Sequence, residues 1–439
     1  MSPLDSVSKM RDTVFMHIYF SGIGGVAIGP LALFAKDAGF EVSGSDIVQS
    51  RYTKIIENAG IRVAIGQTGQ EIVDLHEKKP IDWLVATAAL PENHPEINFA
   101  RQKGIRISKR DEFLNYVIKE KTLKILAVAG THGKTTTTGM LIWLFKAFGI
   151  PVSYTIGTNV SFGPSGQYQS GSNWFVYEAD EFDRNFLRFQ PKVSVITKVD
   201  YDHPDTYATI EDYKNAFIEF IKQSQETYLW KKDCEYLNIS PSQKLHCIDD
   251  TSVLDTLNLP GIHNRENAML AFNIFTTLFA DISKEKILGS LNNFPGTERR
   301  FEKLAQNIYT DYAHHPTEIR AALQTASEVS SSILVVYQPH QNKRQVRLQD
   351  EYQDCFNLAK KVYWLPTYIS REVDKNILTQ EQLISKLSNS GNVQPTQMNG
   401  ALAKLIVNHQ KNGDLVLILG AGDVDDWIRK VVKNEEIAS

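Results

Sequence analysis

A run of glycine, lysine and hydroxyl side chains near residue 130 has the composition of a phosphate-binding loop. Residues 129–136 read Ala-Gly-Thr-His-Gly-Lys-Thr-Thr. Lys134 could place a positive charge on the β- and γ-phosphates of a nucleotide, and the Thr135 hydroxyl could hold Mg²⁺. The full Walker pattern has a glycine where Val128 stands, so this loop is a shortened Gly-x-x-Gly-Lys-Thr form. The expected nucleotide contacts are Gly130, Thr131, His132, Gly133, Lys134, Thr135 and Thr136.

The segments on either side of this loop could position it correctly. Residues 123–128 are almost wholly apolar and predict a buried strand, and residues 137–148 carry apolar side chains at helical spacing. A strand, a glycine turn and a helix together aim backbone N–H groups and the positive end of the helix at phosphate oxygens. The alternative is a strand-turn-helix junction that merely contains a lysine. The common register of both glycines, the lysine and the threonine favours a nucleoside triphosphate site.

A second glycine turn lies near the N-terminus. Residues 14–20 predict a strand, and the turn that follows contains Gly22, Gly24 and Ala27, with Asp46 about twenty residues further on. This is the pattern of a dinucleotide-binding turn, and by itself it suggests an NAD-dependent oxidoreductase. Because any ligand with a diphosphate can use the same helix end, the pattern does not select one ligand. A tight turn without a ligand is a further alternative.

Carboxylates follow two strands of the region after the phosphate-binding loop. Residues 174–177 predict a strand that ends in the acidic segment 178–183, and the strand at 193–198 is followed by Asp202 and His203. Carboxylates at the carboxyl end of a strand beside such a loop are suited to a nucleotide's Mg²⁺. A solvated acidic loop is the alternative. The sequence gives equal weight to His203 as a ligand and as an ordinary surface or core histidine.

A histidine-rich segment follows a strand in the last third of the chain. Asp311 is placed where a strand-end carboxylate can accept a ribose hydroxyl hydrogen bond. The adjacent pair His314 and His315 could suggest a metal site, but neighbouring histidines do not chelate one ion comfortably and no cysteine accompanies them. The segment therefore favours nucleotide contact over metal binding.

Length and composition predict a multidomain cytoplasmic enzyme, and the alternation of predicted strands and helices predicts the α/β class. The chain has 439 residues, 42% hydrophobic residues, 22% charged residues and a net charge of −4, which gives no reason to expect nucleic acid as a partner. Three cysteines without a C-x-x-C pair argue against a disulfide framework or a zinc site and fit a reducing cytoplasm. No signal peptide or membrane-inserting segment is evident. We expect α/β domains at 1–121, 122–297 and 298–439.

Taken together, the motifs resemble those of the Mur ligase family. The matching segments, in family order, are 130–136, 178–183, 202–203, 261–268, 299–302 and 311–318. The resemblance covers nearly the whole chain. It implies a Rossmann-like N-terminal domain for a UDP-sugar, a central P-loop ATPase domain with a mostly parallel sheet, and a Rossmann-like C-terminal domain that closes over ATP. It also implies a role in cell wall biogenesis, and through it in cell shape and cell division.

The resemblance is greatest to the branch that joins L-alanine to the lactyl carboxylate of UDP-N-acetylmuramate through an acyl phosphate. It implies ATP and two Mg²⁺ ions, with Lys134, His203 and Arg300 as catalytic residues. The base that takes the amine proton is not evident, because a metal-bound His203 imidazole cannot also accept it. A monomer or weak dimer is expected. The implied roles are ATP binding by Asn264, Asn267, Arg300 and Asp311, metal binding by Thr135, Glu178 and His203, UDP-sugar binding by Gly22, Gly24, Gly25, Ser45 and Asp46, and amino-acid binding by His340 and Arg344.

Departures from the family pattern keep one alternative open. Gln341 stands where this branch usually has arginine, and Phe217 stands where several family members carry a carbamylated lysine. The L-alanine branch also lacks that lysine, so Phe217 favours it. A recycling ligase, which joins a preformed peptide to the same sugar nucleotide, usually has an insertion that residues 186–191 lack. The oxidoreductase alternative leaves the P-loop and the C-terminal domain without a role.

Overall fold

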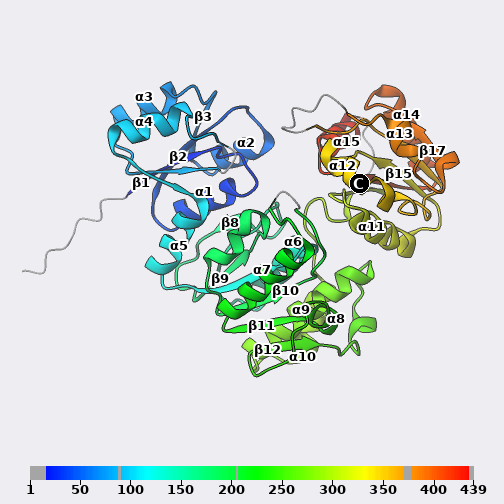
Figure 1. Cartoon of the computed structure of the whole chain (residues 1–439), viewed down its shortest axis with the longest axis horizontal. Helices are drawn as coiled ribbons and strands as arrows, with labels where there is room; N and C mark the ends of the chain where they lie inside the picture. Colours follow the sequence, from blue (N-terminus) through cyan, green and yellow to red (C-terminus); the bar gives the residue numbers. More distant parts are fainter. Residues whose placement is uncertain (1–15, 88–89, 204–205, 370–376, 435–439) are drawn as a thin grey trace, which may run out of the picture. The chain divides into compact units, whose positions relative to one another are not determined.

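The computed structural model describes residues 16–87, 90–203, 206–369 and 377–434 (Figure 1). It contains three separate sheets, and the expected α/β fold class is confirmed. The N-terminal ten residues, which we expected not to form a signal peptide, lie outside the described residues. The chain forms two compact units, the first made of residues 1–129, 145–194 and 203–227, and the second of residues 130–144, 195–202 and 228–439.

The first sheet is wholly parallel and has the strand order β3-β2-β1-β4-β5. All five residues of β1 are buried, as expected for a central strand with helices on both faces. Its strands are β1 (His17–Ser21), β2 (Glu41–Asp46), β3 (Arg62–Ile65), β4 (Trp83–Ala86) and β5 (Arg106–Lys109). Its helices are α1 (Ile28–Asp37), α2 (Arg51–Asn58), α3 (Gln70–Lys78), α4 (Pro95–Lys103) and α5 (Arg110–Glu120).

The second sheet has the strand order β12-β11-β10-β6-β9-β7-β8 and carries the P-loop after β6. Strand β9 pairs in parallel with β6 and β7, and β8 is antiparallel to β7. Its strands are β6 (Lys124–Ala129), β7 (Val152–Thr155), β8 (Gly166–Gln167), β9 (Trp174–Glu178), β10 (Val193–Ile196), β11 (Glu226–Trp230) and β12 (Leu245–Ile248). The associated helices are α6 (Lys134–Ala147), 3₁₀ helix η1 (Phe182–Arg188), α7 (Ile210–Gln223), α8 (Lys231–Tyr236), η2 (Leu254–Thr256), α9 (Ile262–Leu278) and α10 (Lys284–Asn292).

The third sheet has the strand order β13-β14-β18-β15-β16-β17 and is parallel except for β13. Its strands are β13 (Glu302–Ala305), β14 (Ile308–Asp311), β15 (Ile333–Tyr337), β16 (Lys361–Trp364), β17 (Val393–Pro395) and β18 (Leu415–Leu419). Its helices are α11 (Pro316–Val329), α12 (Asn342–Leu348), η3 (Gln349–Tyr352), α13 (Gln380–Ile384), η4 (Ser390–Asn392), α14 (Gly400–Lys411) and α15 (Val424–Asn434).

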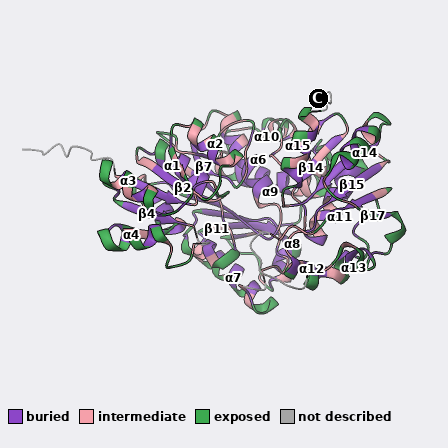
Figure 2. Ribbon diagram, turned by 90° about the horizontal axis from the view of Figure 1, so that it is seen from above, coloured by how far each residue is buried: buried purple, intermediate pink, exposed green. Residues whose placement is uncertain are grey.

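Each sheet supplies the core of its own part of the chain. Strands β15 and β18 are buried at every residue, and Figure 2 shows β15 in purple. Separate apolar clusters cover the two faces of the third sheet, one packed under α11 and the other under α14 and α15. Burial on both faces explains why these strands are continuous apolar runs in the sequence. Within the described residues, no helix is long and apolar enough to cross a bilayer.

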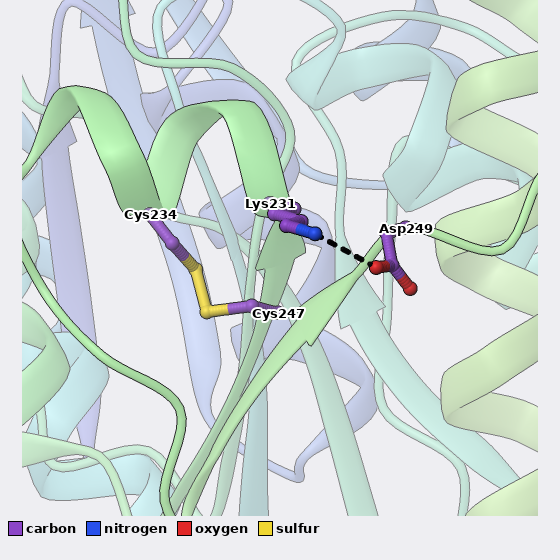
Figure 3. Close-up of a disulfide and its surroundings, with 4 residues drawn as sticks. All are labelled: Lys231, Cys234, Cys247 and Asp249. Carbon is purple, nitrogen blue, oxygen red and sulfur yellow. Dashed lines mark hydrogen bonds and ion pairs between the residues drawn. A yellow bond between two sulfur atoms is a disulfide. The ribbon is translucent and has the colours of Figure 1, made fainter.

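A disulfide joins Cys234 of α8 to Cys247 of β12, so the expectation that the cysteines form none is wrong (Figure 3). Their Cα atoms are 6.3 Å apart because the chain turns back after α8 and brings β12 alongside β11. An ion pair with a separation of 3.1 Å between Lys231 and Asp249 links the same two segments. Cysteine spacing alone could not predict this return of the chain, and cysteine usage no longer supports a reducing compartment.

Replacing Cys247 with serine is expected to destabilise the protein by about 3 kcal/mol, since the bond closes a loop with a sequence separation of 13. Urea unfolding with and without a dithiol reductant would measure this. The variant should unfold at the same midpoint in both conditions, whereas the parent chain should lose stability only with reductant. A parent midpoint that is insensitive to a reductant shown to have broken the bond would contradict the prediction.

Candidate functional site

The P-loop leads from β6 into α6, which begins at Lys134 itself. The Thr131 N–H donates to the Lys198 carbonyl at 2.8 Å, and the Thr131 hydroxyl donates to the Asp200 carbonyl at 2.7 Å. Gly133 has a φ of +86°, and a Cβ there would lie 2.6 Å from the Asn267 side-chain oxygen. Only glycine therefore fits this turn against α9. The loop is held in shape by segments far from it in the sequence.

The Lys134 side chain lies back along the loop that it follows. Its Nζ donates to the Gly130 carbonyl at 2.6 Å and to the Thr131 carbonyl at 3.3 Å. These carbonyls hold the ammonium group beside the loop, where a phosphate would meet it. The Thr135 side chain is buried in the first turn of α6.

A cavity lies beside the P-loop within the second unit, and its volume of about 840 Å³ includes space open to solvent. Polar and charged side chains make up most of its wall, which suits a nucleotide. It brings together predicted residues from four parts of the sequence, namely the P-loop, α9, the segment before β13 and the end of β14. The predicted nucleotide residues in its wall are His132, Gly133, Thr136, Asn264, Asn267, Arg300 and Asp311.

A second cavity of about 540 Å³ adjoins the first and shares Thr136, Asn264 and Arg300 with it. The rest of its wall is largely apolar and was not predicted as part of a site. Such a wall is suited to a flat ring system such as a purine. No sequence pattern indicated this wall, because Met140 could only be interpreted as an apolar residue of the helix after the P-loop. Its apolar residues are Met140, Leu259, Pro260, Phe294, Pro295 and Phe301.

Arg300 and Asp311 place opposite charges in the cavity wall. Arg300 lies just before β13, and Asp311 ends β14. Asp311 accepts hydrogen bonds from the N–H groups of Phe301 and Ala313, each at 2.8 Å. Burial raises the pKa of Asp311 to about 6, although the charge of Arg300 opposes this shift. The Arg300 guanidinium lies 5.3 Å from the centre of the Tyr312 ring. The pair thus places a cation close to a buried carboxylate whose pKa is raised.

His132 lies between two carboxylates at the edge of the same cavity. Its Nε2 is 3.4 Å from Asp200 Oδ2, and its Nδ1 is 3.3 Å from Glu318 Oε1. Burial lowers the pKa of His132, but the hydrogen bonds and charges of Asp200 and Glu318 outweigh burial and raise it. The same contact with His132 holds the pKa of Asp200 at about 2. Electrostatics therefore favours an imidazolium between two carboxylates.

The predicted metal ligands Glu178 and His203 each have contacts within the protein. In the described part of the chain, no three histidine, cysteine, aspartate or glutamate side chains gather as a metal site. Glu178 Oε2 accepts the Gly157 N–H at 2.9 Å, and His203 Nε2 is 3.7 Å from Glu181 Oε1. A hydroxyl and a carboxylate are the hard oxygen donors that suit Mg²⁺, which ordinarily also keeps waters and binds phosphate oxygens. Thr135 and Glu178 fit that donor set, and His203 fits it less well.

The N-terminal glycine turn and the end of β2 are in contact, as their spacing predicted. The N–H groups of Gly22 and Ile23 both donate to the Ser45 carbonyl at 2.9 Å. The Gly24 N–H donates to Asp46 Oδ2 at 2.8 Å. Asp46 therefore fixes the turn from within the protein, and this leaves less of its carboxylate for a ligand than the sequence suggested.

A shallow pocket lies beside this turn within the first unit. Gly25 contributes to its wall, together with side chains from α2 and from the segment 157–165. Tyr52 is a polar residue of this wall that sequence reasoning did not single out. Its signal is weak, since it belongs to no recognisable motif.

His340 and Arg344, the predicted amino-acid residues, flank the start of α12. The Arg344 guanidinium is 4.0 Å from Asp202 Oδ2, and the His340 ring lies 5.6 Å from the His314 ring. Burial and the neighbouring charge of Arg344 lower the pKa of His340 to about 4. Gln341 has a φ of +63°, and its N–H donates to the Tyr368 carbonyl at 2.9 Å. The segment therefore offers a neutral imidazole and one guanidinium.

The fold and the main cavity define a nucleotide-binding protein of the P-loop α/β class. Three family profiles match the chain in sequence: "Mur ligase family, catalytic domain" at residues 17–122, "Mur ligase middle domain" at 128–243 and "Mur ligase, glutamate ligase domain" at 299–422. The chain belongs to the Mur ligase family, as the motifs indicated.

Several relatives carry the same name. The UDP-N-acetylmuramate–L-alanine ligase of Clostridium botulinum is 32% identical over 93% of this chain and 95% of its own length. That of Cytophaga hutchinsonii is 30% identical over 96% and 97%. The crystal structure of the Thermotoga maritima UDP-N-acetylmuramate–alanine ligase superposes with a TM-score of 0.78 at 26% identity, covering 96% of this chain and 99% of that one. A murein peptide ligase from Psychrobacter arcticus shares the fold, with a TM-score of 0.67 at 22% identity over 95% and 98%.

Proposed function

We propose that this protein joins L-alanine to the lactyl carboxylate of UDP-N-acetylmuramate at the expense of ATP, a step of peptidoglycan precursor synthesis. The family assignment and the names of the full-length relatives support this reaction. The observation that carries it is the cavity beside the P-loop, which gathers residues from distant motifs around one space. The chain is an ATP-dependent ligase.

ATP is needed because a carboxylate is a poor acylating agent. Attack of the lactyl carboxylate oxygen on the γ-phosphorus breaks the bond to the β-phosphate oxygen and gives an acyl phosphate and ADP. The neutral amine of the amino acid then attacks the acyl carbon, and inorganic phosphate leaves. Phosphoryl transfer needs positioning and neutralisation of charge more than covalent help. The amine's proton goes to a base that neither the motifs nor the geometry identify.

We assign the nucleotide roles from the motifs together with the cavity wall. Arg300 of the wall, and Lys134 of the P-loop beside it, would supply positive charge to the phosphates, and the P-loop helix end would supply N–H groups. Asn264 and Asn267 offer amides on the base side, and Asp311 offers a carboxylate to a ribose hydroxyl. When bound, two Mg²⁺ ions would neutralise charge on the phosphates, with Thr135, Glu178 and His203 as their protein ligands.

The remaining substrates are assigned to two other sites. The turn of Gly22, Gly24 and Gly25, with Ser45 and Asp46, would bind the diphosphate of the sugar nucleotide. His340 and Arg344 would meet the carboxylate of the amino acid. We propose domains at 1–121, 122–297 and 298–439, in a cytoplasmic monomer or weak dimer. If the compartment is reducing, the Cys234–Cys247 disulfide would be sensitive to its redox state.

The recycling ligase is the second candidate within the family. The murein peptide ligase with a similar structure is under 25% identical and supports only the fold. Phe217 is fully buried and packs against Phe186 at 5.2 Å between ring centres, so a carbamylated lysine at this position would not fit the core. This favours a branch without that lysine.

The carboxylate of Asp311 is expected to make nucleotide affinity depend on pH. Its pKa of about 6 lies above the usual range, so the group is ionised at pH 7.5 and largely protonated at pH 5. If the ribose hydroxyl donates to the ionised form, ATP affinity should fall as the pH drops through 6, by up to about tenfold per pH unit. ATP affinity would be measured for the parent and for Asp311→Asn between pH 5 and 7.5. The difference between the two profiles removes the contribution of ATP's own protonation, which is the same for both proteins. Parallel pH profiles for the two proteins would contradict this role.

Replacing Glu178 with glutamine is expected to raise the Mg²⁺ concentration that supports half-maximal activity, because a neutral amide is a weaker ligand for a hard cation. The glutamine can no longer offer the second carboxylate oxygen as an anionic ligand, while its amide oxygen can still accept the Gly157 N–H. Activity measured against Mg²⁺ at saturating ATP tests this. An unchanged Mg²⁺ titration would assign Glu178 to holding the Gly157 turn alone.

A thermal-shift panel tests the substrate classes directly. UDP-N-acetylmuramate and ATP with Mg²⁺ should each raise the melting temperature, since a ligand that binds only the folded state stabilises it. NAD should produce no shift. Stabilisation by NAD without stabilisation by the sugar nucleotide would support the oxidoreductase alternative and contradict the proposed reaction.

A further inference from the structure

The P-loop histidine is tied to a helix of the third sheet rather than to its own loop. His132 Nδ1 contacts Glu318 Oε1 of α11 at 3.3 Å, and its ring centre lies 5.3 Å from that of His315. Its other ring nitrogen faces Asp200, and its carbonyl accepts the Thr197 hydroxyl at 2.5 Å. Both ring nitrogens and the carbonyl of the residue therefore face groups outside the P-loop.

The partner carboxylate is itself fixed in the first turn of α11. Glu318 Oε2 accepts the backbone N–H groups of His314 and His315 at 3.1 and 3.3 Å, and so completes a capping box at the start of the helix. One carboxylate thus holds the start of α11 through one oxygen and the P-loop through the other. A neighbouring contact, at 3.2 Å between the Thr317 hydroxyl and Asp200, runs in parallel.

Both members of the pair line the cavity beside the P-loop. His132 and Glu318 belong to opposite ends of its wall in the sequence, separated by 186 positions. Neither supplies net positive charge to phosphates, because the two carboxylates that flank the His132 imidazolium balance its charge. Their contact is suited to fixing the distance between the P-loop and α11. The groups on these two segments that contact a nucleotide are then also held at a fixed distance from one another.

We propose that His132 and Glu318 are positioning residues which couple the P-loop to α11, so that the nucleotide binds tightly only while this pair is intact. The inference rests on the proposed assignment of the cavity to ATP. It adds that nucleotide affinity depends in part on a contact within the protein, between His132 and Glu318, in which the nucleotide takes no part. The two side chains should therefore act as one unit in binding experiments.

A double-mutant cycle on the full chain tests this coupling. The variants are His132→Ala, Glu318→Gln and the double variant, and the probe is the β,γ-imido analogue of ATP with Mg²⁺, measured by calorimetry. Each single change should raise the dissociation constant by about tenfold, and the double change should raise it no further than either single one. His132→Gln keeps a donor and should recover part of the loss. Affinity for UDP-N-acetylmuramate should stay within twofold in all of them.

The ion pair of Arg265 and Glu328 provides a matched control. It is bidentate, at 2.8 and 3.0 Å, and like the His132–Glu318 contact it joins α11 to another segment, here α9. Neither Arg265 nor Glu328 lines the cavity beside the P-loop. Arg265→Gln and Glu328→Gln should lower thermal stability while leaving the analogue's dissociation constant within twofold. An equal loss of affinity in this control would show that any contact to α11 suffices, and would overturn the specific role of His132 and Glu318.

Two further results would overturn the inference. If the losses of the two single variants multiply in the double variant, the residues act independently. If the parent chain binds no ATP analogue, the assignment of the cavity to ATP fails first, and this outcome is distinct because the single variants are then irrelevant. Circular dichroism identifies a variant that does not fold. If Glu318→Gln does not fold, Glu318→Asp replaces it in the cycle, because this side chain keeps the negative charge but is too short to keep the contact with His132.

Discussion

Replacing Lys134 with alanine is expected to lower turnover by roughly two to three orders of magnitude, because one positive charge is lost from the transferring phosphoryl group. The side chain lies along the P-loop, where its Nζ is held by the Gly130 and Thr131 carbonyls, and it takes no part in an apolar cluster. The fold should therefore survive. Release of ADP, followed in a coupled assay with all three substrates, gives the rate.

Lys192→Ala is the matched control for the loss of a lysine. Its Nζ is exposed and donates to Gln225 at 2.8 Å, outside the walls of the described cavities. This variant should keep the parent turnover. A Lys134→Ala enzyme that still released ADP at nearly the parent rate would remove the phosphate role assigned to the loop.

The second large effect is expected at the N-terminal turn. Gly24→Val should raise the KM for UDP-N-acetylmuramate by about 100-fold and leave the KM for ATP within a few-fold, because the turn would no longer present its N–H groups to a diphosphate. A Cβ at Gly24 would lie 2.7 Å from Thr53 Cγ2 and 2.9 Å from Asp46 Oδ2, so the turn must shift. Initial rates at varied concentrations of each substrate separate the two constants.

Folding of the Gly24→Val enzyme must be checked by circular dichroism, since the same clash strains the turn. Gly289→Val is a control for the substitution itself, because a Cβ there meets nothing within 4 Å. A well-folded Gly24→Val enzyme that lost ATP affinity and kept the sugar nucleotide would reverse our assignment of substrates to sites.

The parts of the fold that depend on local sequence were predictable. The P-loop is one continuous segment between an apolar strand and an amphipathic helix, and the structure has β6, the turn and α6 in that order. Helix α6 begins at Lys134, three residues before the apolar pattern suggested, because the polar residues of its first turn carry no hydrophobic signal. The buried strands β15 and β18 were equally clear as apolar runs.

Features that depend on distant contacts were not predictable. The disulfide requires β12 to return beside β11, and no spacing rule gives that. The 3₁₀ helix η1 begins within the acidic segment 178–183 and contains Asp183 and Arg184 at positive φ. Aspartate is enriched in this conformation, but its presence alone does not predict two such residues in succession.

The site shows the same division. Motifs named seven residues of the main cavity, but they did not reveal the apolar wall around Phe294 or the carboxylates on either side of His132. Those arise where separate elements pack together, and single-sequence patterns carry no information on such packing. The motif residues were accessible because the family resemblance supplied their relation to one another.

The most direct test of the central claim is an acceptor screen with the purified chain, UDP-N-acetylmuramate, ATP and Mg²⁺. Amino acids and a murein tripeptide are supplied one at a time, ADP release is recorded, and the product is weighed by mass spectrometry. We expect ADP release to depend on both L-alanine and the sugar nucleotide, with a product whose mass equals the two joined with loss of water. Reaction with the tripeptide and not with L-alanine, or no ligation with any acceptor, would contradict the proposed function.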